Sequence, residues 1–446
     1  MDQSLAVTYR NVAMPWNNRG MISSASPLHF PSSRTLSRSS HRAPLTTMLV
    51  AALALMIPVL TGCDGAQPTA SPSTPTSPTL ATSPLLRSPA PRTDDSPAAQ
   101  ATRLARSMSL QELVGQLVMA PLPTGYDPAN LKDEIEQDHV GSVLVTGNWN
   151  GGAAAVGTAT KALQGYAGDG PKLITATDQE GGMVQHLQGP GFDPIPSGVQ
   201  QGARSVDDLR AAAATWGGQL AAAGINVNLA PVVDTVAVNR ASNAPIGALD
   251  RDFGLDAQGN GAHAQAFVNG MRDAGVSSAI KHYPGLGGVT GNTDFTADGI
   301  TDATTTLQSP SLGAFSTALE AHPAMVMMSL ATYTAVDPHH PAAFSSTLID
   351  GHLRGDQGFQ GVVISDSLSA AAVSGIPQDQ LGVSLIEAGG DLACISAPSV
   401  VRPVLDGLNA KAATDPGFAA KVTRSAIRVL ALKYQMHLAG APTARP

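Results

Sequence analysis

The sequence predicts a single-domain (β/α)8 barrel of the TIM type. From about residue 99 onward, short apolar runs alternate with alanine-rich stretches of helical character. The apolar runs number eight, and a closed barrel of this kind needs eight strands. Strict alternation of strand and helix implies parallel strands joined by right-handed crossovers.

The expected strands are runs of apolar, often β-branched residues, a pattern typical of strands buried on both faces. They cover residues 113–121, 140–146, 172–177, 225–233, 278–282, 324–329, 362–365 and 391–396. Helical patterns separate most of them and cover residues 153–167, 206–223, 257–274, 309–321, 345–354, 378–388 and 417–436. The expected domain covers residues 99–440. It is longer than the roughly 250 residues typical of such barrels, but insertions between the elements account for such a length.

The N-terminal residues 1–62 are predicted to be a signal peptide. Arg34, Arg38 and Arg42 precede the apolar run MLVAALALMIPVL at 48–60, which is too short to cross a bilayer comfortably. The run ends in LTGC, which resembles a bacterial lipobox and implies cleavage before Cys63 with lipid attached to its sulfur. We therefore expect a lipoprotein outside the cytoplasm, anchored to the bacterial cell membrane. An ordinary signal peptide with an incidental cysteine is the alternative.

Residues 64–98 are rich in proline, serine and threonine and have few bulky apolar side chains. Such a segment cannot bury enough apolar surface to offset its conformational entropy. We expect a disordered tether between the anchor and the barrel.

Composition excludes several classes of protein. The chain has 446 residues, 43% of them apolar, and a net charge of −8 without a basic stripe, so there is no electrostatic basis for nucleic-acid binding. Its two cysteines, Cys63 and Cys394, exclude a disulfide scaffold, and Cys394 in the apolar run DLACIS is expected to be a small buried side chain. No HExxH or other metal-ligand spacing is present, so we expect neither a metal nor a cofactor.

The stretch GVVISDSLS, residues 361–369, is the most informative for function. An apolar run leads directly to Asp366, so a buried strand delivers a carboxylate at its C-terminal end, which is the chemical end of a parallel barrel. Asp366 as a helix cap is the alternative.

Other expected strands also end in polar residues of functional types. These are Asp178 and Glu180 after the third strand, Asp234 and then Arg251 after the fourth, and Lys281 and His282 in the fifth. A glycine-rich loop carrying Asn292 and Asp294 follows. Carboxylates, cations and a glycine-rich loop are thus expected on one rim of the barrel.

Five ordered motifs resemble a known family. They are DQEGG at 178–182, GINVNLAPVVD at 224–234, DRDFG at 250–254, AIKHYPG at 279–285 and LIDGHLRGDQGFQGVVISD at 348–366. Together they resemble the family 3 glycoside hydrolases, and most closely the single-domain bacterial β-N-acetylhexosaminidases. One motif alone would be a weak signal, but five in matching order are specific.

The resemblance implies a retaining, exo-acting hydrolase of terminal N-acetylglucosamine in cell-wall peptidoglycan fragments or related β-glycosides. It implies a single catalytic domain that acts as a monomer. Asp366 is then the nucleophile that forms a covalent glycosyl-enzyme. The residues expected to bind the sugar are Asp178, Arg251, Lys281 and His282, whose charged groups make strong hydrogen bonds with hydroxyls.

The chain departs from the family pattern in the loop after AIKHYPG. These enzymes usually carry an acid/base histidine there, oriented by an aspartate. In this sequence Asp294 stands in place of that histidine, Asn292 in place of the aspartate, and Leu286 in place of an earlier loop histidine. Met183 replaces the usual arginine after DQEGG.

Asp294 is our candidate for the missing acid/base, with Asn292 as its candidate orienting residue. If Asp294 lies near Asp366, like-charge repulsion and desolvation raise the pKa of one of the two carboxyls. Most retaining glycosidases use two carboxyls about 5 to 5.5 Å apart. The alternative is a solvated loop aspartate in a slow or inactive protein.

Two other functions stay open at this point. One is a catalytically degenerate lipoprotein that binds cell-wall glycan, and the intact SD context of Asp366 argues against it. The other is a β-glucosidase of the same family, although those enzymes generally carry further domains that contribute to the site.

Overall fold

The computed structural model describes residues 94–440. The expected signal peptide, Cys63 and most of the expected tether lie outside the described residues. The first described helix, α1 (Pro97–Ser107), is capped by the hydroxyl of Ser96 and packs against the last one, α11 (Pro416–Gln435).

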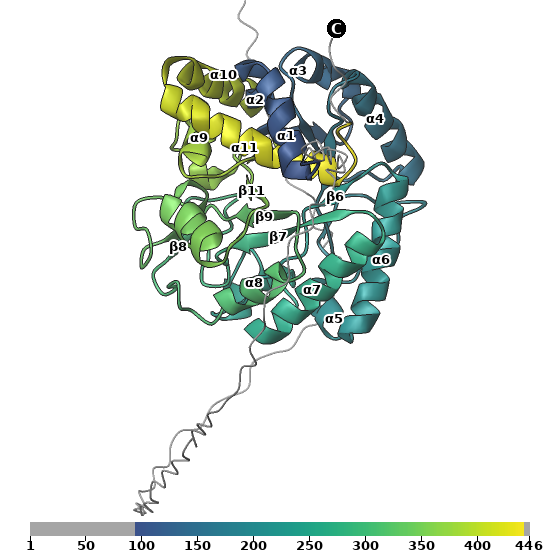
Figure 1. The fold of residues 1–446 in the computed structure, drawn as a ribbon. Coiled ribbons are helices and arrows are strands. Elements are labelled where there is room, and N and C mark those ends of the chain that lie inside the picture. The colour runs from purple at the N-terminus through teal and green to yellow at the C-terminus, as the bar shows by residue number, and fades with distance from the viewer. Residues whose placement is uncertain (1–93, 441–446) are drawn as a thin grey trace, which may run out of the picture. The chain divides into compact units, whose positions relative to one another are not determined.

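A closed ring of eight parallel strands forms the centre of the described domain (Figure 1). In ring order the strands are β1 (Val118–Pro123), β2 (Ser142–Thr146), β3 (Ile174–Thr177), β6 (Val227–Asn228), β7 (Ser277–Tyr283), β9 (Met325–Met328), β11 (Val362–Ser365) and β12 (Ala393–Cys394). Ile364 pairs in parallel with Leu392, next to β12, and this bridge closes the ring. The ring order equals the chain order, so the predicted (β/α)8 barrel is confirmed.

Helices surround the ring. They are α1, α2 (Leu110–Gly115), α3 (Lys132–Glu136), α4 (Gly152–Tyr166), α5 (Gly198–Gly202), α6 (Val206–Ala222), α7 (Ala257–Asp273), α8 (Leu312–Leu319), the π-helix η5 (Thr347–Asp356), α9 (Gln378–Glu387), α10 (Pro398–Thr414) and α11. Short 3-10 turns are η1 (Pro128–Leu131), η2 (Arg240–Ser242), η3 (Gly247–Leu249), η4 (Ala342–Phe344) and η6 (Ala371–Val373). Two small pairs of strands lie outside the barrel: β4 (Gln179–Gly181) with β5 (Val184–Gln185), and β8 (Thr301–Asp302) with β10 (Thr332–Tyr333).

Three predicted strands are only partly correct, and one of them, 391–396, contributes only Ala393–Cys394 as β12. The run 113–121 begins in helix α2, because a capping box between Ser109 and Glu112 starts a helix there. In the run 225–233 the strand β6 covers only Val227–Asn228, and Val232 forms a separate parallel bridge with Lys281 beyond Pro231, which has no N–H to donate. The expected helix 345–354 is the π-helix Thr347–Asp356.

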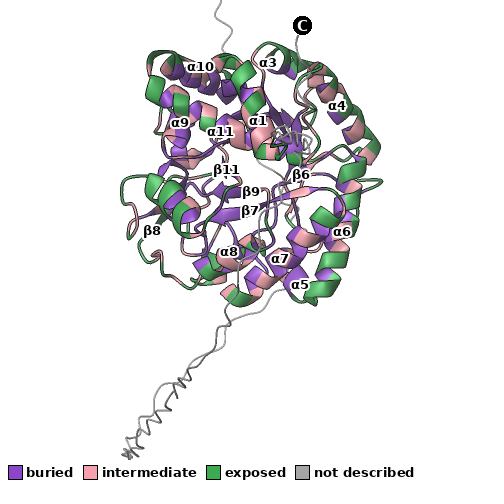
Figure 2. Ribbon diagram, viewed as in Figure 1, coloured by how far each residue is buried: buried purple, intermediate pink, exposed green. Residues whose placement is uncertain are grey.

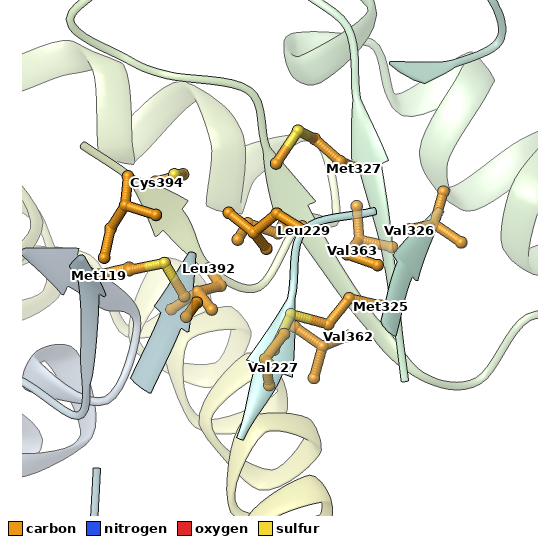
Figure 3. Close-up of a cluster of buried hydrophobic side chains, with 14 of the residues drawn as sticks. Met119, Val227, Leu229, Met325, Val326, Met327, Val362, Val363, Leu392 and Cys394 are labelled. Carbon is orange, nitrogen blue, oxygen red and sulfur yellow. The ribbon is translucent and has the colours of Figure 1, made fainter. Parts of the chain in front are cut away.

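The barrel interior is apolar. Figure 2 shows buried residues on the central strands and exposed residues on the outer faces of the helices. Figure 3 shows the side chains that fill the interior, among them Met119, Val227, Met325, Val362 and Leu392. Close packing of these groups holds the strands in one register, which fixes the positions of the residues that follow each strand.

Candidate active site

A cavity of about 460 Å³ opens at the C-terminal ends of the barrel strands. Its lining includes Thr146 at the end of β2, Asp178 after β3, Asp366 after β11 and Ser396 after β12. Strand ends from around the ring therefore meet in one hollow, as expected for the chemical end of such a barrel. Its floor is part of the barrel core, since Leu229, Met327 and Cys394 both line the cavity and appear in Figure 3.

A larger cavity of about 750 Å³ lies at the opposite end of the barrel. Its lining includes Ser277, Ala324 and Gly361, at the starts of β7, β9 and β11. Glu320 is its one acidic lining residue. We therefore place the chemistry in the smaller cavity, which holds several carboxylates.

One wall of the smaller cavity is an ion-pair cluster. Lys281 Nζ lies 2.6 Å from Asp178 Oδ1 and 2.6 Å from Glu180 Oε1. The Arg251 guanidinium donates to both Glu180 oxygens, at 2.9 and 2.7 Å. Burial opposes ionisation of Glu180, but Arg251 and Lys281 outweigh it and hold the pKa of Glu180 well below its usual value. The carboxylates in turn raise the pKa of Lys281 despite its burial.

Strand β7 delivers both Lys281 and His282 to the cavity. Its register against β9 shifts between Lys281 and Tyr283, and such a bulge turns successive side chains to the same side. The fully buried Asp234 then fixes the histidine: Oδ2 lies 2.7 Å from His282 Nδ1, and Oδ1 accepts the His282 N–H at 3.2 Å and the Leu286 N–H at 2.8 Å. The other ring nitrogen, Nε2, is 3.4 Å from Arg251.

Asp366 follows β11 directly and is half-buried in the cavity wall. Its N–H donates to the Met328 carbonyl at 2.9 Å, which continues the pairing of β11 with β9. Its Oδ1 accepts the Ser367 N–H at 2.7 Å. The carboxylate is thus held by the rigid barrel rather than by a loop, as a nucleophile requires.

The loop after β7 brings Asp294 to the same cavity. Asn292 Oδ1 accepts the Asp294 N–H at 3.0 Å, so the amide shapes the backbone turn that carries the carboxyl. Two further bonds tie this turn to η6, beyond Asp366: the Ala371 N–H donates to the Asp294 carbonyl at 3.2 Å, and the Ala372 N–H to the Thr293 carbonyl at 3.0 Å.

Asp294 has the charge environment of a general acid. Burial first, and the negative charge of Asp366 second, raise the pKa of Asp294 to about 6. Although protein atoms surround it in the cavity, Asp294 is still exposed to solvent. Its carboxyl can therefore hold a proton near neutral pH and exchange it with water.

The structure brings all the residues selected from the sequence to one cavity. Asp178, Arg251, Lys281, His282, Asn292, Asp294 and Asp366 line it. Sequence reasoning assigned no role to Glu180 or Asp234, although both lie in quoted motifs, because it could not show which side chains they pair with. It also missed His186, which lines the cavity with Nε2 4.0 Å from Asp178 Oδ2. Burial lowers the pKa of His186, and no sequence signal marked this residue.

Residues 94–440 contain neither a candidate metal site nor a helix that could span a membrane. No group of three or more histidine, cysteine, aspartate or glutamate side chains in this part of the chain is arranged to hold a metal ion. Within the same range, every helix is too short or too polar to cross a membrane.

A (β/α)8 barrel whose strand ends place two carboxyls and a polar cluster in one cavity is an architecture that glycoside hydrolases use. The chain belongs to glycosyl hydrolase family 3: the model of the "Glycosyl hydrolase family 3 N terminal domain" matches residues 109–432. This finding confirms the family recognised from the motifs.

Similar proteins support the same family. A solved β-N-acetylhexosaminidase from Beutenbergia cavernae is 46% identical, with a TM-score of 0.70 over 73% of this chain and 99% of that one. A family 3 β-N-acetylglucosaminidase from Paenibacillus sp. is 30% identical, with a TM-score of 0.65 over 76% of this chain and 65% of that one. A β-hexosaminidase of Xylella fastidiosa strain M23 is 36% identical over 248 residues, which are 53% of this chain and 70% of that protein.

Proposed function

We propose that the protein is a retaining, exo-acting β-N-acetylhexosaminidase that releases terminal β-linked N-acetylglucosamine. The observation that carries the proposal is the presence of Asp366 and Asp294 in one cavity with the cluster of Asp178, Arg251 and Lys281. The β-hexosaminidase names of the relatives support the choice of sugar.

The reaction uses the two carboxyls in different roles. Ionised Asp366 attacks the anomeric carbon, while protonated Asp294 gives its proton to the departing glycosidic oxygen. The bond from carbon to that oxygen breaks as the bond to Asp366 forms. Asp294, now a carboxylate, then takes a proton from water, whose oxygen displaces Asp366 and restores both groups.

The polar cluster suits recognition of sugar hydroxyls. Asp178 accepts hydrogen bonds, whereas Lys281 and Arg251 donate them, and charged partners make these bonds strong. Their mutual ion pairs hold the groups in place before substrate binds. His282, fixed by Asp234, presents Nε2 as a further polar contact.

A fluorinated N-acetylglucosamine analogue that forms the intermediate quickly and loses it slowly tests the proposal. We expect its mass on the peptide that contains Asp366, and hydrolysis with retained anomeric configuration. Labelling of another peptide, or an inverted product, would remove Asp366 as nucleophile. Binding of N-acetylglucosamine without any labelling or turnover would instead support a degenerate, glycan-binding protein.

We further propose that the enzyme acts as a monomeric lipoprotein on the outer side of the bacterial cell membrane, on peptidoglycan fragments. The LTGC sequence ending at Cys63 and the proline-rich segment that follows support this location.

A further inference from the structure

Phe295 is an unusually exposed aromatic residue at the mouth of the candidate active site. Its exposed fraction is 81%, the highest among the exposed large apolar side chains of residues 94–440. A single exposed apolar side chain needs no explanation by itself. Of the five large apolar residues exposed in that range, however, Phe295 is the one that lines the cavity.

The cavity has a buried end and an exposed end. Lys281, His282 and Leu286 are at most 3% exposed and mark the buried end, where Lys281 and His282 supply polar groups that suit the sugar being released. Phe295 and Ser396 line the same cavity but are exposed. A substrate that enters with its terminal sugar toward the buried end therefore leaves its remaining part beside the exposed end.

Phe295 follows Asp294 in the chain and lines the same cavity. An acid must reach the glycosidic oxygen, so the bond that breaks lies beside Asp294. The group beyond that oxygen is the leaving group. It lies toward the exposed end of the cavity, because Asp294 and Phe295 both line the cavity and both are exposed. The turn is held to η6 through the Asp294 and Thr293 carbonyls, so this arrangement is built into the loop.

We propose that Phe295 forms a leaving-group subsite that binds the apolar face of a second sugar ring. This inference rests on the proposed function and specifies its substrate as at least a disaccharide. A pyranose has C–H groups on one face and hydroxyls around its edge, so it suits a cavity whose exposed lining includes both an aromatic ring and a serine hydroxyl. Ser396 supplies such a hydroxyl, and its Oγ lies 2.6 Å from Ser367 Oγ.

Two substrates with chemically similar leaving groups test the subsite: N,N′-diacetylchitobiose and methyl β-N-acetylglucosaminide. Both leaving groups are alcohols, but only the first presents a ring to Phe295. We expect Phe295→Ala to lower kcat/KM for the disaccharide about three- to tenfold, mainly through KM. The methyl glycoside should react at an unchanged rate, and Phe295→Trp should restore the disaccharide reaction.

Val206→Ala is the matched control, because Val206 is 41% exposed but lies outside the cavity lining. It should leave both substrates unaffected. Equal losses with both substrates in Phe295→Ala would show a role in loop structure and overturn the subsite. Unchanged rates with both would overturn it as well.

The failure of the subsite can be told apart from the failure of the proposed function. If the wild type hydrolyses neither compound, the proposed function fails. The affinities of wild type and Phe295→Ala for N,N′-diacetylchitobiose, measured by calorimetric titration, then test the subsite independently of turnover. Weaker binding by the variant supports it, and equal affinities overturn it.

Discussion

Asp294 is the residue on which the chemistry of this site depends most. Protonation matters most for a poor leaving group, so Asp294→Ala should lower kcat/KM for an unactivated disaccharide by about 10² to 10⁴. The dinitrophenyl leaving group needs little protonation, so Asp294→Ala should slow formation of the glycosyl-enzyme from a dinitrophenyl glycoside far less. Azide should rescue the variant, because it attacks the intermediate without needing a base. Wild-type rates on the disaccharide would show that the acid lies elsewhere.

The pH profile tests the same residue independently. Because the pKa of Asp294 is raised to about 6, the acid form is lost as pH rises through 6. We therefore expect kcat/KM for the disaccharide, which reports the free enzyme, to fall on the alkaline side of that pH. The fall should be absent in Asp294→Ala, whereas Asn292→Ala should keep it, because an amide positions the turn but exchanges no proton.

At the scale of elements, Glu180 joins the β4–β5 hairpin to two other parts of the barrel. It pairs with Lys281 of β7 and with Arg251 after η3, and its own side chain is 4% exposed. Removing one charge from a buried cluster leaves its partners uncompensated, which typically costs about 3–5 kcal/mol. We expect Glu180→Gln to lower the free energy of unfolding at pH 7 by about 3 kcal/mol, measured by urea denaturation.

The difference between wild type and Glu180→Gln should depend on pH. The pKa of Glu180 is lower in the fold than its ordinary value of 4.5, so its stabilising contribution is present above pH 4.5 and is lost as pH falls below it. Asp406→Asn is the matched control, since Asp406 is 64% exposed and 3.8 Å from Arg402. A difference that persists unchanged at pH 3 would contradict the ion-pair explanation.

Most barrel elements could be predicted from sequence, because their patterns are local. The run 362–365 needs only its own apolar residues to be recognised as a buried strand, and it is one. Helix α10 was missed because Pro398 and Pro403 resemble helix breakers, although Pro398 occupies the first turn, where proline is tolerated.

The site was less predictable, because it depends on contacts between distant residues. Asp366 and Lys281 follow from strand patterns and motif order. The partners of Glu180 lie 71 and 101 positions away in the sequence. The raised pKa of Asp294 depends on a loop that bonds to residues 371 and 372, and no local pattern shows that contact.

At the scale of the whole molecule, buried polar groups outside the candidate active site join parts of the chain that are far apart in sequence. Lys433 of α11 is fully buried, and its Nζ donates to Gln116 Oε1 at 2.6 Å, across 317 positions. Burial lowers the pKa of Lys433 to about 7.

Lys433→Met should therefore stabilise the protein near neutral pH. The pKa of Lys433 is about 7 in the folded protein and ordinarily 10.5. Between pH 7 and pH 10.5 the unfolded chain therefore binds a proton that the folded protein does not. Wild-type stability then rises with pH across that window, while below pH 7 the burial penalty is constant. We expect Lys433→Met to gain about 1–3 kcal/mol at pH 7, and less at pH 10. Lys161→Met, at an exposed position of α4, should change little.

The location of the whole protein depends on Cys63, which lies outside the described residues. A diacylated cysteine supplies two lipid chains, which give stable anchoring where one gives only marginal binding. The wild type should therefore partition with membranes, and Cys63→Ala should be found in the aqueous fraction. Cys394→Ala is the control, because this buried residue of β12 offers no site for a lipid and its loss should leave partitioning unchanged. If Cys63→Ala stays fully membrane-bound, lipid attachment is wrong, and the uncleaved apolar run at 48–60 is the anchor.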